Sequence, residues 1–169
     1  MKVSTKRRTI TARSGFSLIE GMAAAGILAV GLLALAGMQT IAMNRNVDAN
    51  DLTVAANLAG AMMERIQFNR IRAATNASPY NGINTQAPGT QPNAANEPQA
   101  SGDYVQWTAA LAASGLTNTF GTVVVTPIIT NPPLNQYQVA VAVNWQAKER
   151  AGGFVRNQIV TMTSIVSME

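Results

Sequence analysis

The apolar run from residue 16 to residue 43 is the feature that most limits how this chain can fold. Glu20 is the only charged residue among these 28 residues, so the run cannot remain in water without a cover. As an α-helix it would measure roughly 42 Å at about 1.5 Å per residue, which is enough to cross a bilayer. A chain of 169 residues then has room for one small domain beside it.

Basic residues are concentrated ahead of the apolar run. Five lysines and arginines precede Gly15, and no acidic residue lies among them. The remaining seven basic and eight acidic residues carry a net charge of −1, so the pI near 10 does not indicate a positively charged folded surface. No nucleic-acid partner is indicated. The positive-inside rule predicts a cytoplasmic N-terminus, with the residues after Arg45 on the other side of the membrane.

Three interpretations of the N-terminal segment differ in what they explain. A secretory signal peptide cut after Ala36 would release a soluble binding protein beginning at Gly37, but its leader would be long and would carry the carboxylate of Glu20. A permanent single-span anchor gives Glu20 no role, although a charge inside a membrane helix is costly. The third interpretation explains both the long leader and the carboxylate.

That interpretation depends on the sequence RSGFSLIE at residues 13–20. This stretch resembles the processing site of type IV prepilins and of type II secretion pseudopilins. The resemblance implies that a membrane peptidase cuts between Gly15 and Phe16 and methylates the new amine of Phe16. Such a cut would also give the costly carboxylate a partner, because Glu20 of one subunit can meet the cationic Phe16 amine of a neighbour in a stack of parallel helices, which would favour one axial register. The alternative is that Glu20 lies close enough to the membrane interface to stay hydrated and has no such role.

The rest of the chain is predicted to form a small head. Pro, Gly and Asn residues between 75 and 102 rule out regular structure there. A short helix should follow at 103–113, capped by Ser101 or Asp103, with Trp107 and Leu111 facing inward. The predicted segments are a cleaved leader at 1–15, an apolar helix at 16–43, an amphipathic helix at 44–74, a variable low-complexity loop at 75–102 and the head at 103–169.

Three strands are expected in the head. The first covers 122–130, and the second is marked by strict alternation of apolar and polar residues from Tyr137 to Trp145. A polar turn at 148–153 leads to the third strand at 155–166. The predicted fold class is α+β: a long N-terminal helix packed on a small three-stranded antiparallel sheet, which is the pilin fold that the resemblance implies.

The sequence contains no cysteine and no histidine, so disulfides, thiolate nucleophiles and histidine ligands are excluded. The acidic residues are scattered, and neither a catalytic set, a metal site nor a cofactor site is indicated. The resemblance likewise implies that the chain is a substrate of the processing peptidase and not an enzyme.

Two further segments resemble V-type minor pilins of the type IV pilus. They are the sequence LAGAMMERIQFN at residues 58–69 and the Y-x-V-x-V-x-V-x-W strand at 137–145. The resemblance implies a minor pilin that helps to initiate pilus assembly, a role associated with adhesion, twitching motility or DNA uptake. Its implied partners are the prepilin peptidase, other pilins contacted through the N-terminal helix, and the inner membrane before assembly. A minor pseudopilin of a type II secretion system is the alternative.

Overall fold

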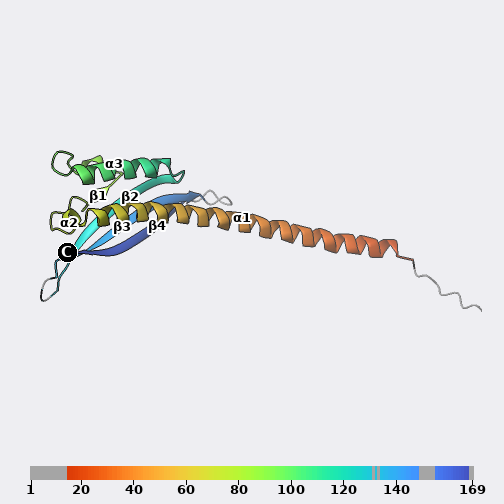
Figure 1. Cartoon of the computed structure of the whole chain (residues 1–169). Helices are drawn as coiled ribbons and strands as arrows, with labels where there is room; N and C mark the ends of the chain where they lie inside the picture. The colour runs from red at the N-terminus through yellow and green to blue at the C-terminus, as the bar shows by residue number, and fades with distance from the viewer. Residues whose placement is uncertain (1–14, 131, 133, 149–154, 168–169) are drawn as a thin grey trace, which may run out of the picture. The chain divides into compact units, whose positions relative to one another are not determined.

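The computed structural model describes residues 15–130, 132, 134–148 and 155–167. The chain divides into two compact units, residues 1–43 and residues 44–169, and each is described by itself (Figure 1). The basic residues ahead of Gly15 and most of the turn predicted at 148–153 lie outside the described residues.

The first helix, α1, runs from Leu18 to Phe68 and belongs to both units. It contains no proline, and alanine, leucine and methionine, which favour helices, are frequent along it. Its buried residues all lie in the second unit, where they form a stripe at helical spacing: Ala55, Ala59, Met62, Met63 and Ile66. This stripe confirms the predicted amphipathic character. The helix is followed directly by the short helix α2, Arg70–Ala73.

The second unit, called the head below, contains an antiparallel sheet with the strand order β1-β2-β3-β4. The strands are β1 (Ile83–Asn84), β2 (Thr117–Ile128), β3 (Gln136–Lys148) and β4 (Val155–Ser167). The prediction of an α+β fold is confirmed, although the sheet has four strands and not three. The additional strand β1 has only two residues, too few to leave a pattern in the sequence.

One face of the sheet is covered by helices. The sulfur of Met162 on β4 would lie 3.7 Å from a Cβ atom added at Gly60 of α1, and Trp107 of helix α3 (Pro98–Ala113) packs on Gly121 of β2. The register of the strands places Gly121 and Met162 on the same face, so α1 and α3 lie side by side on it (Figure 1). The core between these layers includes the alternating β3 residues predicted to face inward: Tyr137, Val139, Val141, Val143 and Trp145.

The region from 75 to 102 corrects the prediction that regular structure is ruled out there. It contains β1, the 3₁₀ helix η1 (Pro88–Thr90) and the first residues of α3. Tyr80 and Ile83 are both almost fully buried. The burial of these two large side chains fixes this segment onto the head, although prolines and asparagines shape its turns.

Helix α3 begins five residues earlier than predicted. Glu97 is its N-cap residue and Pro98 occupies the first turn, where a proline's missing N–H breaks no helical hydrogen bond. Ser101 and Asp103 are therefore interior helix residues and not caps, which corrects the prediction. Trp107 and Leu111 face inward as expected, each only 2% exposed.

Candidate functional site: the start of the apolar helix

The residues around the predicted cleavage site lie just outside α1. Gly15, Phe16 and Ser17 are exposed and have no regular structure, and the helix begins at Leu18. The backbone N–H of Glu20 donates to the carbonyl oxygen of Ser17 at 3.0 Å and lies 3.4 Å from its Oγ atom. Ser17 is thus the N-cap residue, and it precedes Glu20 by three positions, the spacing of a capping box.

Gly15 has no packing role in the described structure. A Cβ atom added there would meet no heavy atom within 4 Å, and its φ angle lies outside the left-handed region that favours glycine. Gly21, six residues further along, is equally free of neighbours. The fold of the described residues therefore gives no reason for a glycine at position 15.

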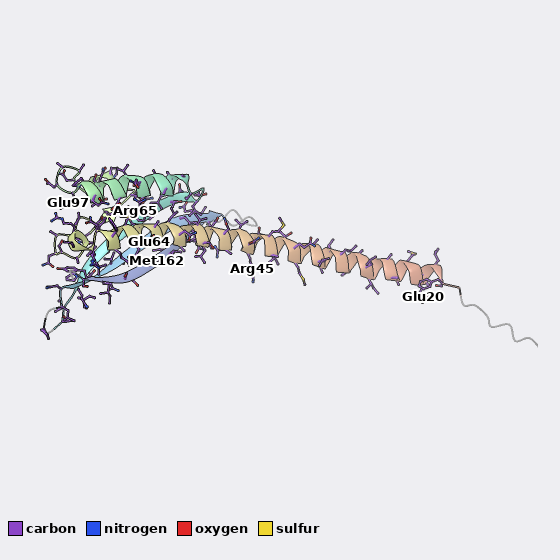
Figure 2. The ribbon with its side chains drawn as sticks, viewed as in Figure 1. Glu20, Arg45, Glu64, Arg65, Glu97 and Met162 are labelled. Carbon is purple, nitrogen blue, oxygen red and sulfur yellow. The ribbon has the colours of Figure 1, made fainter. Side chains whose placement is uncertain are left out.

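Glu20 lies in the first turn of α1, where a carboxylate interacts favourably with the helix dipole (Figure 2). Its side chain is exposed, and no residue in the described part of the chain forms an ion pair with it. The helix start thus offers Glu20 two local roles, as an acidic residue at N3 and as a favourable charge near the dipole. Neither role needs a second subunit.

The apolar half of α1 has no cover within its own unit. None of its most apolar stretch is buried, and its large side chains are extensively exposed, as at Leu18 (86%) and Leu33 (80%). The helix is long and apolar enough to cross a membrane, and a signal sequence would have the same properties. Exposing so much apolar surface to water is unfavourable, so lipid or other apolar helices must cover it.

A buried polar network connects three parts of the head. The carboxylate of Asp103 on α3 is 4% exposed; it accepts a hydrogen bond from Tyr80 Oη at 2.7 Å and forms an ion pair with Arg65 Nη1 at 3.3 Å. Asn69 Nδ2 donates to the same tyrosine oxygen at 3.0 Å. The network joins the end of α1 to the segment before β1 and to α3.

The environment of Tyr80 changes its acidity. Burial raises the pKa of the Tyr80 hydroxyl well above its usual range, and the hydrogen bond from Asn69 opposes this rise. The hydrogen bond to Asp103 and the negative charge of that carboxylate raise the pKa further. Tyr80 is thus a neutral hydrogen-bond donor at physiological pH, which suits a structural role and not proton transfer.

The head also has a pocket of about 230 Å³ between α1 and the sheet. Its polar lining comes from Asp48, Asp51 and Gln158, with Trp145 at its apolar wall. Asp48 already pairs with Arg156 at 3.8 Å. The indole N–H of Trp145 has no hydrogen-bond partner among the described residues, and the adjoining pocket has room for water to satisfy it.

No group of three or more metal-ligating side chains is found among the described residues. No family model matches the chain, and no curated protein or solved structure is significantly similar to it. The features of the described residues that point to a function are therefore the exposed segment 15–17, the lone carboxylate of Glu20 and the uncovered apolar helix.

Proposed function

We propose that this chain is a minor pilin of the type IV pilus, made as a prepilin and assembled through α1. The observation that carries the proposal is the arrangement at residues 15–20. An exposed, non-helical Gly15–Phe16 bond stands directly before the apolar half of α1, whose only carboxylate, that of Glu20, lies in the first turn. Gly15 has no packing role and the peptide bond that follows it is exposed, so a peptidase can reach this bond.

Cleavage at this bond would give Glu20 a partner. The freed and methylated amine of Phe16 stays cationic, so the Glu20 carboxylate of one subunit can pair with the amine of the next in an apolar array of parallel helices. Leaving either charge unpaired there is costly, so the pair fixes the axial register. Before assembly the helix would reside in the inner membrane, with a cytoplasmic N-terminus and a periplasmic head; after assembly the head would be exposed on the pilus.

The first experiment is to determine the mass and N-terminal sequence of the mature chain from cells with a functional pilus system. We expect a chain that begins at N-methylated Phe16. A chain beginning at Gly37 would instead show a signal peptide and a soluble secreted protein. Deletion then separates the two filament systems: loss of piliation or twitching is expected for a pilin, and loss of protein secretion for a pseudopilin.

Two glycine variants provide a matched test of the cleavage site. Gly15→Val should block removal of residues 1–15, because a bulky side chain next to the scissile bond hinders the peptidase. Gly21→Val adds the same side chain at a position that is equally free of neighbours, and its processing should be normal. Equal processing of both variants would contradict the assignment of Gly15.

A further inference from the structure

The two edges of the head sheet differ in how their backbone groups are satisfied. Along β2 the segment around β1 supplies partners: Gly121 N donates to Thr85 Oγ and Val125 N donates to Asn81 Oδ1, each at 2.9 Å. This edge of the sheet is therefore partly closed by side chains as well as by strand pairing. Covering an edge in this way prevents unwanted pairing with other chains.

The opposite edge, β4, has no such cover. All thirteen of its residues pair with β3, and from residue 157 to residue 167 no described residue outside β3 hydrogen-bonds to its backbone. In an antiparallel ladder every second residue directs its N–H and C=O groups away from the partner strand. The described strand contains no proline or glycine, and Arg156 is its only charge. It therefore lacks the usual devices that protect an edge.

The sequence of this edge is nearly the same in both directions. From Ile159 to Ile165 it reads I-V-T-M-T-S-I, with Met162 at the centre. If a second copy paired antiparallel about Met162, Ile159 would lie opposite Ile165 and Thr161 opposite Thr163. These four side chains lie on the sheet face away from the helices, where the two isoleucines are 59% and 62% exposed.

We propose that two copies of this chain pair through β4, antiparallel and centred on Met162, to form one continuous sheet. A two-fold contact needs a surface that is complementary to itself, and the I-V-T-M-T-S-I sequence has this property. Opposed β-branched side chains and threonine pairs stabilise antiparallel strands. The two Arg156 side chains lie at opposite ends of the contact, so no like charges meet. The proposal does not depend on the proposed function.

The contact also fixes how the two heads are arranged. Because Met162 contacts α1 at Gly60 (Figure 2), the two-fold axis, perpendicular to the sheet, places the head portions of both α1 helices on the same face of the joined sheet, where they run in opposite directions.

Disulfide trapping tests the contact, because the natural chain contains no cysteine. Full-length Thr161→Cys and Thr163→Cys chains, carrying tags of different mass, are mixed in detergent micelles and oxidised. In the proposed register, position 161 of one copy lies directly opposite position 163 of the other, with Cβ atoms about 4.5–5.5 Å apart, whereas two identical positions lie diagonally, about 7–8 Å apart. A disulfide needs the shorter distance, so we expect at least about threefold more of the mixed disulfide than of the same-variant disulfide. Thr126→Cys, exposed on β2, is the control and should cross-link weakly with either variant.

A pair of lysine variants tests the role of the edge itself. Adding Ile165→Lys to the cysteine chains should abolish the mixed disulfide, whereas Val124→Lys, a similarly exposed change on β2, should leave it intact. A mixed yield no higher than that of the Thr126→Cys control would overturn the proposal. So would equal yields of mixed and same-variant products, or capture of a different protein by Thr161→Cys in cells.

Discussion

The indole ring of Trp107 on α3 lies directly against the backbone of Gly121 on β2, where no β2 side chain intervenes. A Cβ atom added at Gly121 would overlap the ring. The ring is 2% exposed, and its Nε1 atom donates to the carbonyl oxygen of Leu58 at 2.9 Å, which fixes its orientation. This one contact therefore couples α3 to both β2 and α1.

Gly121→Ala should destabilise the head by about 1–3 kcal/mol, because either the Trp107 ring or strand β2 must shift to make room for the added methyl group. The free energy of unfolding, measured by urea denaturation with tryptophan fluorescence, reports the change. Gly102→Ala is the control: a Cβ atom there meets nothing within 4 Å, and alanine is favoured over glycine inside a helix by roughly 0.5–1 kcal/mol. Similar effects of the two substitutions would contradict the described packing.

The raised pKa of Tyr80 makes the stability of the head depend on pH in the alkaline range. Because the folded-state pKa lies above the unfolded value of 10.0, the contribution of the neutral hydroxyl is complete below pH 10 and is lost as the pH rises towards the folded-state pKa. Above pH 10, wild type should lose up to about 1.4 kcal/mol per pH unit more than Tyr80→Phe. If the free energy of unfolding fell with pH in the same way for both proteins, Tyr80 would ionise as easily in the folded chain as in the unfolded chain.

Asp103→Asn should cost about 1–3 kcal/mol, because the buried network loses its charge and the acceptor geometry that Tyr80 and Arg65 use. Asp48→Asn makes the same chemical change in an exposed pair with Arg156 and should cost less than about 1 kcal/mol. Urea unfolding of both variants at neutral pH makes the comparison. An equal loss of unfolding free energy in the two variants would mean that burial of Asp103 adds nothing to the stability that its interactions provide.

Glu20→Gln should leave processing intact and prevent assembly, since the amide cannot compensate the charge of the Phe16 amine in an apolar array. Glu64→Gln makes the same change at an exposed position further along α1, in the head, and both processing and assembly should continue. N-terminal sequencing measures the first step, and the amount of the chain in sheared pili measures the second. Normal incorporation of Glu20→Gln would restrict Glu20 to its local role in the first turn of α1.

Elements with a strong period were predictable from the sequence. The alternation along β3 matched the buried face. The helical spacing of apolar residues along the second half of α1 indicates Leu52, Ala55, Leu58, Ala59, Met62 and Ile66. Four of these are fully buried, but Leu58 is only partly buried and Leu52 is 51% exposed. The start of α3 was missed because Pro98 was interpreted as a helix breaker, although proline is also favoured in the first turn of a helix. The S-x-x-E spacing of Ser17 and Glu20 was present in the sequence and would have identified the helix start.

Non-local contacts could not be predicted in the same way. β1 forms because Ile83 pairs with Val123, forty residues later, and nothing in the two-residue strand reveals this partner. The burial of Tyr80 depends on Asp103 and Asn69, which lie in different helices or at their ends. Gly121 inside a strand was a usable signal, since such a glycine often marks a close approach, but it does not identify Trp107 as the neighbour.

The partly closed edge of the sheet at β1 and β2 has a consequence for how far self-association can proceed. A fibre that grows by strand pairing needs an unpaired sheet edge on both sides of every unit, so that each unit can pair with the unit before it and with the unit after it. Here the side chains of Asn81 and Thr85 occupy part of one edge, so a chain that binds a strand at β4 presents little open backbone on its other side. Growth by strand addition should therefore stop at a finite particle.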